Sequence, residues 1–121
     1  MPKFVTKEIH AYLDYPVAIG LLVFPFLLNL GQSNPMAMWL SVLTGGAAFF
    51  LTALTDHHLG LIRVLPYKFH LFVDGLVGVA FVAAPFLFGF TGLDLTYYVA
   101  LGITVLFVVG LHKPEEESLI A

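Results

Sequence analysis

Two histidine–aspartate pairs are the side chains of this sequence whose types and spacing could support chemistry. His10 and Asp14 form the first pair, and His70 and Asp74 repeat the same spacing sixty residues later. Residues four apart lie on one face of an α-helix, so each pair presents an imidazole next to a carboxylate. Both groups are metal ligands, and histidine can also ligate haem iron or carry a proton.

Several interpretations of the two pairs stay open. If the pairs meet, all four side chains could hold one divalent metal ion, or the two histidines could be the axial ligands of a haem. With residues of the central loop, they could instead handle protons or bind a lipid headgroup. Those loop residues are His57, His58 and Arg63. The structural interpretation, which we favour, is that the pairs tie the helix starts to the loop, where the helix dipole stabilises an aspartate.

The chain that positions these pairs is short and strongly apolar. It has 121 residues, of which 60% are hydrophobic and 11% charged, with a mean hydropathy of +0.95. From Tyr15 to Thr55 there is no Asp, Glu, Lys, Arg or His, and from Gly75 to Leu111 the only one is Asp94. Since about 20 apolar residues cross a hydrocarbon core of about 30 Å, each stretch accommodates two spans. We predict an all-α membrane protein with four transmembrane helices.

Turns and loops divide this chain into two similar units. The predicted spans cover about 9–30, 36–55, 67–90 and 95–111, and segments rich in Gly, Asn and Pro separate them. The whole chain, 1–121, is then a single membrane domain, with repeat one at about 8–56 and repeat two at about 67–112. A loop at 57–66 joins the repeats, and a flexible tail follows at 113–121.

The positive charges predict how the chain is oriented in the membrane. All five lie on the side that holds both termini and the central loop, namely Lys3, Lys7, Arg63, Lys68 and Lys113. By the positive-inside rule, this side faces the cytoplasm, and the membrane is predicted to be the bacterial cytoplasmic membrane. The polar N-terminus lacks a small-residue cleavage site, so we expect it to be mature sequence rather than a signal peptide.

The two units also share a proline. Pro25 and Pro85 occupy matching places, and each unit has two spans, so the units run in the same direction as parallel repeats. We expect both prolines to kink their helices near the middle of the bilayer and to free the carbonyls of Leu21 and Phe81. Hydroxyl groups would have to satisfy those carbonyls; the candidates are Thr44, Thr52 and Thr104.

These features resemble the small bacterial SPW-repeat membrane proteins, whose units have a K-x-H-x-x-x-D start and a Ser-Pro-Trp motif. Lys68, His70 and Asp74 match that start, and the stretch from Asp56 to Asp74 is similar to the central segment of the family. At the name motif this chain has Phe24-Pro25-Phe26 and Ala84-Pro85-Phe86, so both copies lack the serine and the tryptophan. The resemblance implies a four-helix bacterial membrane protein and implies no activity.

The predicted function is that of a non-enzymatic structural or accessory subunit. The sequence has no recognisable nucleophile–base pair or phosphate-binding loop, and a net charge of −3 gives no reason to expect a nucleic-acid partner. The lipid bilayer and other membrane helices are the expected partners, and Gly45 and Gly46 offer a flat face for close helix packing or a homo-oligomer. The alternative is a cofactor, metal ion or lipid headgroup bound by the His-x-x-x-Asp pairs on the cytoplasmic side.

Overall fold

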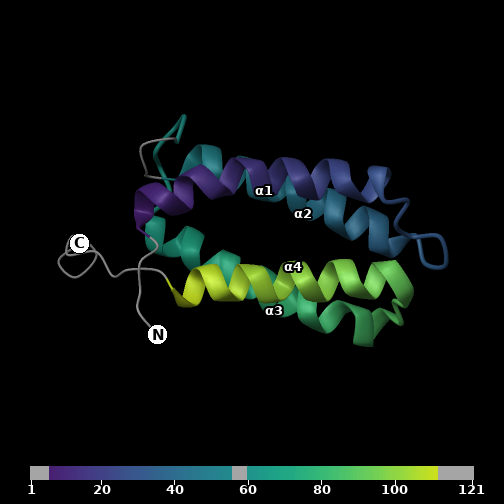
Figure 1. Ribbon diagram of the computed structural model, residues 1–121. Helices are drawn as coiled ribbons and strands as arrows, with labels where there is room; N and C mark the ends of the chain where they lie inside the picture. Colours follow the sequence, from purple (N-terminus) through teal and green to yellow (C-terminus); the bar gives the residue numbers. More distant parts are fainter. Residues whose placement is uncertain (1–5, 56–59, 112–121) are drawn as a thin grey trace.

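Four α-helices form two antiparallel hairpins in the computed structural model of the chain (Figure 1). The structure describes residues 6–55 and 60–111; the predicted tail at 113–121 lies outside them. The helices are α1 (Lys7–Leu27), α2 (Met36–Leu54), α3 (Tyr67–Phe88) and α4 (Gly92–Gly110). Each is long and apolar enough to cross a membrane, and the described residues hold no strand beyond a single bridge between Thr55 and Leu65. The predicted all-α, four-span fold is confirmed, and the chain is an integral membrane protein.

The ends of α1 and α3 show the internal repeat in atomic detail. The Leu30 N–H donates to the Pro25 carbonyl at 2.9 Å, and the Phe90 N–H donates to the Pro85 carbonyl at 2.9 Å. The turn also needs one residue at positive φ, which is Asn29 at 52° in the first copy and Gly89 at 73° in the second. These hydrogen bonds stop both helices before the predicted limits of 30 and 90. In contrast, α4 starts at Gly92, three residues earlier than predicted.

The two prolines lie nearer the ends of their helices than expected, and their predicted depth in the bilayer and the predicted kinks stay predictions. Pro25 and Pro85 lie in the last turns of α1 and α3, not in the middle of the spans, and both are buried. Pro25 has no N–H to donate to the carbonyl of Leu21. This carbonyl instead accepts a hydrogen bond from the Ser41 hydroxyl of α2 at 2.9 Å. The three threonines predicted for this role instead donate to carbonyls of their own helices, four residues earlier. A further proline, Pro16, also lies inside α1 and was not part of the predicted pattern.

Glycine allows the two helices of each hairpin to approach closely. A Cβ atom on Gly45 of α2 would lie 2.9 Å from the carbonyl oxygen of Ala18 in α1. A Cβ atom on Gly102 of α4 would lie 2.8 Å from the carbonyl oxygen of Gly78 in α3. Gly45 therefore packs inside its own hairpin, whereas the space around Gly46 is open.

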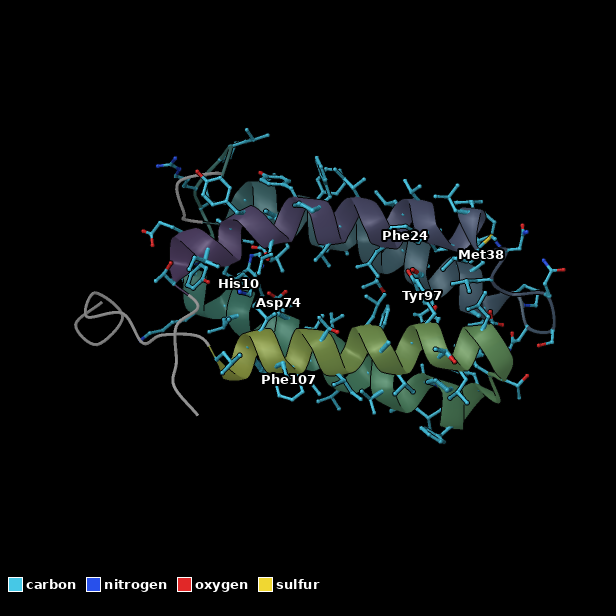
Figure 2. All side chains as sticks on the ribbon, in the orientation of Figure 1. His10, Phe24, Met38, Asp74, Tyr97 and Phe107 are labelled. Carbon is cyan, nitrogen blue, oxygen red and sulfur yellow. The ribbon has the colours of Figure 1, made fainter. Side chains whose placement is uncertain are left out.

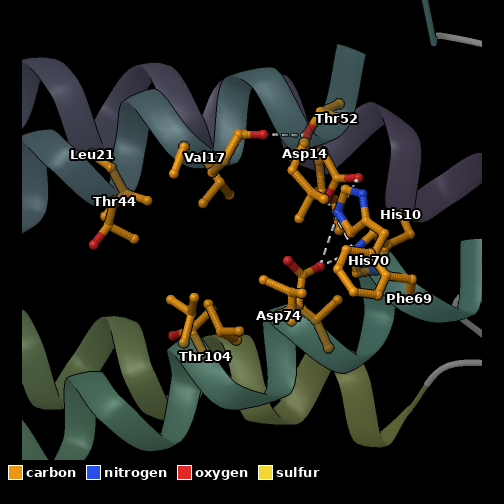
Figure 3. Close-up of a pocket in the computed structure, with 18 residues that line it drawn as sticks. His10, Asp14, Val17, Leu21, Thr44, Thr52, Phe69, His70, Asp74 and Thr104 are labelled. Carbon is orange, nitrogen blue, oxygen red and sulfur yellow. Dashed lines mark hydrogen bonds and ion pairs between the residues drawn. The ribbon is translucent and has the colours of Figure 1, made fainter. Parts of the chain in front are cut away.

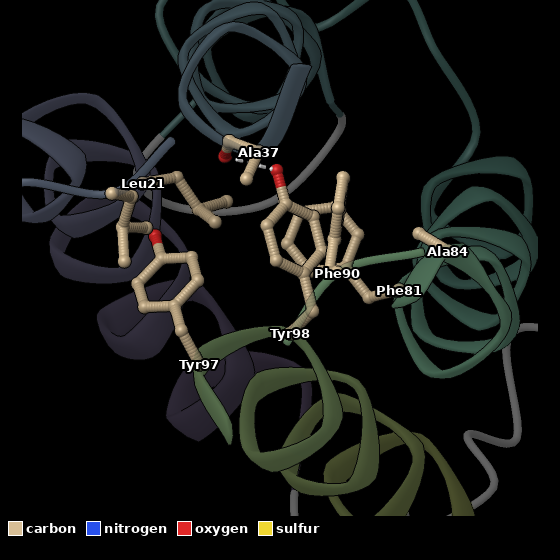
Figure 4. Packing of buried hydrophobic residues seen from close by; sticks show 8 residues of the cluster. Leu21, Ala37, Phe81, Ala84, Phe90, Tyr97 and Tyr98 are labelled. Atoms are coloured by element: carbon tan, nitrogen blue, oxygen red, sulfur yellow. Dashed lines mark hydrogen bonds between the residues drawn. The ribbon is translucent and has the colours of Figure 1, made fainter. Parts of the chain in front are cut away.

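Polar contacts join the two hairpins at the end of the bundle that carries the two short turns, called the turn end below. The Tyr98 hydroxyl donates to the Ala37 carbonyl, and the Tyr97 hydroxyl lies 2.7 Å from the Ser41 hydroxyl. The Gly31 N–H also donates to the buried Asp94 carboxylate at 3.0 Å. Around these groups lies the main hydrophobic cluster, which Figure 4 shows as Leu21, Ala37, Phe81, Ala84, Phe90, Tyr97 and Tyr98. The turn end is thus a packed core shared by both hairpins.

Candidate functional site

The structure brings the two histidine–aspartate pairs together at the opposite end of the bundle, where α1 and α3 begin. We call this the terminal end. Figure 2 shows His10 and Asp74 there, with Tyr97 at the far end of the space between the hairpins. One ligand atom from each of the four side chains lies within 4.8 Å of the others, and both histidines are almost fully buried. His10, Asp14, His70 and Asp74 are called the His/Asp cluster below.

Each histidine contacts the aspartate of its own helix and the aspartate of the other hairpin. His10 Nε2 lies 2.9 Å from Asp14 Oδ1 and 2.7 Å from Asp74 Oδ2. His70 Nε2 lies 3.2 Å from Asp14 Oδ2 and 3.2 Å from Asp74 Oδ2. The pattern follows from the repeat, because the i, i+4 spacing sets one contact and the meeting of the starts of α1 and α3 sets the other. The cluster therefore links the two repeats through two crossed contacts, His10 to Asp74 and His70 to Asp14.

Thr55 controls which nitrogen of His70 faces the cluster. The buried Thr55 hydroxyl donates to the Leu51 carbonyl, and His70 Nδ1 lies 2.7 Å from the same hydroxyl oxygen. Since the hydroxyl proton is already used, Nδ1 must carry the hydrogen and donate it to Thr55. In a neutral ring, the lone pair of Nε2 then points at two carboxylate oxygens. Thr55 was not among the predicted site residues, because its only signal in the sequence is a hydroxyl at the end of an apolar span.

Of the three loop residues predicted to close over the cluster, the structure describes Arg63. Arg63 is exposed, and its Nε donates to the Gly60 carbonyl at 3.3 Å. His57 and His58 lie outside the described residues, so their predicted role stays a prediction. Tyr67, at the start of α3, packs against both histidine rings, with ring centroids 5.9 Å from His10 and 6.2 Å from His70.

A cavity of about 510 Å³ opens directly beside the cluster (Figure 3). It lies between the hairpins, and all four helices contribute to its lining. Its walls are largely apolar, with residues such as Val17, Ala48, Val77 and Val105. The four polar groups of the cluster thus face a mostly hydrophobic space rather than open water.

The geometry of the histidines fits a single ion better than a haem. Their ring centroids are 5.6 Å apart, their planes cross at 88°, and both Nε2 atoms contact the same oxygen of Asp74. In a haem with two axial histidines, the porphyrin plane would have to separate the rings. A metal ion needs only the space between the four ligand atoms, and two imidazoles with two carboxylates are a ligand set that Zn²⁺ accepts.

Comparison with protein families gave a match to the SPW repeat domain over residues 8–112. The matched region contains both hairpins, both proline turns and all four members of the His/Asp cluster. Comparisons with curated proteins and with solved structures gave no match. The match spans most of the chain and confirms the resemblance seen in the repeated His-x-x-x-Asp and proline positions: this protein belongs to the SPW repeat family.

Proposed function

We propose that this protein is a non-enzymatic membrane protein that binds one divalent transition-metal ion of the Zn²⁺ type. The ligands are the four members of the His/Asp cluster. The observation that carries the proposal is their convergence, because each repeat supplies one imidazole and one carboxylate to the same point. Two histidines and two carboxylates suit a tetrahedral ion, and the arrangement uses every polar side chain that the repeats hold in common at this depth.

The distances support an ion at the centre of the cluster. Zn²⁺ binds histidine nitrogen and carboxylate oxygen at about 2.0 Å, which places neighbouring ligand atoms of a tetrahedral site about 3.3 Å apart. The histidine nitrogens lie 2.7 and 3.2 Å from Asp74 Oδ2, and 2.9 and 3.2 Å from the two oxygens of Asp14. All four ligand atoms lie within 4.8 Å of one another, so an ion would lengthen the shortest contacts and draw the more distant ligand atoms closer.

The orientation of His70 gives a second reason. Its neutral form directs a lone pair at Asp14 and Asp74, which repels their oxygens unless a positive charge lies between them. A bound cation supplies that charge, and the Thr55 contact on Nδ1 is the kind of outer contact that fixes the tautomer of metal-binding histidines. Protonation of both histidines would satisfy the same contacts without a metal ion. Metal titration distinguishes a cluster that binds a metal ion from one that only binds protons.

The direct test is metal stoichiometry of the purified full chain in detergent, after chelation and titration with Zn²⁺. We expect one ion per chain in the wild type and none in a His10→Ala, His70→Ala variant. A His57→Ala, His58→Ala variant removes the same number of imidazoles and should bind normally. Thr55→Val should weaken affinity by roughly 10–100-fold, as loss of an outer contact does. Equal binding by the two double variants would contradict the proposal.

We also propose that the terminal end faces the cytoplasm of a bacterial cell. The positive charges support this orientation, and those within the described residues, Lys7, Arg63 and Lys68, lie at the terminal end. The chain has no cysteine, so single cysteines report position cleanly. In intact cells, a membrane-impermeant maleimide should label Gln32→Cys at the turn end and leave Leu61→Cys, at a residue that is 78% exposed, unlabelled. Permeabilised cells should label both, and the reverse pattern would mean the opposite orientation.

Assembly with other membrane helices, or with a second copy, is a further part of the proposal. The open space around Gly46 supports it, because a glycine on an outer helix face allows another helix to approach closely. Many large apolar side chains, such as Leu43 and Phe50 on the same helix, are also exposed and available to lipid or to a partner.

A further inference from the structure

The cavity between the hairpins has a shape and size suited to a ligand of its own. Its volume of about 510 Å³ falls within the range of about 300–1,000 Å³ that is usual for pockets of small molecules. It starts at the His/Asp cluster and extends to Leu21, which also belongs to the hydrophobic cluster of the turn end. The cavity is therefore polar at one end and meets a packed apolar core at the other.

The side walls of the cavity favour a ligand whose main part is apolar. Three threonines line the cavity, but their hydroxyl protons are directed to backbone carbonyls of their own helices, at 2.7 to 2.8 Å. These residues are Thr44, Thr52 and Thr104. The remaining walls carry mainly valine, leucine and alanine side chains. A polar ligand would lose its water contacts in this space without replacing them, whereas an apolar one gains by leaving water.

The polar end of the cavity favours a ligand that carries a positive charge. Two carboxylates and two imidazoles line this end of the cavity, and among the described residues that line it none is a lysine or an arginine, so this end is negatively charged when the imidazoles are neutral. The Oδ2 atom of Asp74 makes both histidine contacts, and the other oxygen of Asp74 points into the cavity (Figure 3). In a space with few competing water molecules, such an oxygen attracts a cation and repels an anion more strongly than it would at the surface.

From these observations we infer that the cavity binds a lipophilic organic cation, with its apolar groups between the hairpins and its positive centre beside Asp74. The inference does not depend on the metal proposal, since the walls, the volume and the carboxylate belong to the cavity itself. It does predict a link between the two ligands. A metal ion and an organic cation would both need Asp74, so each should displace the other.

Two ions of nearly equal shape and opposite charge provide the test. Binding of tetraphenylphosphonium and of tetraphenylborate to the metal-free full chain in uncharged detergent is measured by equilibrium dialysis against micelles without protein. We expect one tetraphenylphosphonium per chain, bound at least tenfold more tightly than tetraphenylborate. Asp74→Asn should reduce the affinity at least tenfold, and saturating Zn²⁺ should displace the cation. Tighter binding of the borate, or an unchanged Asp74→Asn variant, would overturn the inference.

A cavity-filling pair of variants tests the location. Val105 lines the cavity, whereas Ile103 on the same helix is 43% exposed. Val105→Trp should abolish cation binding while Zn²⁺ binding, which reports an intact cluster, is retained; Ile103→Trp should leave both unchanged. Cation binding that survives Val105→Trp places the ligand elsewhere and refutes the inference. Zn²⁺ binding without cation binding would reject only this inference, and cation binding without Zn²⁺ would reject only the proposed function.

Discussion

Replacing Asp14 alone by leucine is expected to destabilise the metal-free bundle by about 3–5 kcal/mol, because it leaves buried histidines with half of their carboxylate partners. The side chain of Asp14 is 10% exposed and contacts both His10 and His70, at 2.9 and 3.2 Å. Replacing all four cluster residues by leucine should instead give a stability close to that of the wild type or above it. In that variant the four members of the cluster are removed together, the Thr55 hydroxyl keeps its hydrogen bond to the Leu51 carbonyl, and apolar packing replaces costly buried charges.

Unfolding of the metal-free proteins in mixed micelles, followed by circular dichroism, provides the comparison. Tyr12→Leu is the matched control on α1, since Tyr12 is 64% exposed, and it should change stability by less than about 0.5 kcal/mol. Zn²⁺ at 100 times its dissociation constant should stabilise the wild type by about 2.7 kcal/mol and the quadruple variant not at all. A quadruple variant as unstable as Asp14→Leu would show that the cluster is needed for structure, in line with the structural interpretation of the pairs.

The His/Asp cluster shows how a small chain can build a four-ligand site from two repeats. One hairpin carries one imidazole and one carboxylate, which is half of a tetrahedral site. Parallel duplication puts the second half at the same depth, and the starts of α1 and α3 meet so that the two halves face each other. The crossed contacts of His10 and His70 mean that neither repeat completes the cluster alone. The site is therefore a property of the pair of repeats.

The sequence predicted the spans because membrane crossing depends on the length of an apolar run, which is a local property. It also predicted that His10 and His70 lie at the same depth, because two spans per repeat make the repeats parallel. It could not predict that the pairs meet, since this depends on which helices touch across the bundle. The partner of the Leu21 carbonyl shows the same limit: three threonines were candidates, and Ser41 is the donor because it faces α1.

Thr55 and the helix ends show where local patterns were insufficient. Nothing about Thr55 in the sequence indicated that a residue fifteen positions before His70 would fix the tautomer of that ring. The ends of α1 and α3 were predicted two or three residues too late, because an apolar run continues through the hydrogen-bonded turns after Pro25 and Pro85. Hydropathy measures which residues can enter the membrane and does not report where the backbone leaves the helix.

Gly102→Val is expected to separate α3 from α4 and to disturb the whole bundle. The new Cβ would lie 2.8 Å from the Gly78 carbonyl oxygen and 2.8 Å from the Val82 backbone nitrogen, and neither backbone atom can move without moving α3. Gly45→Val should do the same in the first hairpin, where the carbonyl of Ala18 is 2.9 Å away. Overpacking of this kind costs about 1–3 kcal/mol, and here it also shifts one half of the His/Asp cluster against the other. Zn²⁺ affinity should therefore fall together with stability.

Gly46→Val and Gly110→Val are the controls, because a Cβ atom at either position would have no neighbour within 4 Å. Both should unfold as the wild type does and keep their affinity for Zn²⁺. Gly46→Val also tests assembly: if the face around Gly46 contacts a second copy, cross-linking in detergent should give less dimer in this variant than in Gly110→Val. Equal stability of Gly45→Val and Gly46→Val would contradict the packing of α1 on α2. Since these residues are adjacent in sequence and identical in type, a difference between the two variants can arise only from the faces of α2 on which they lie.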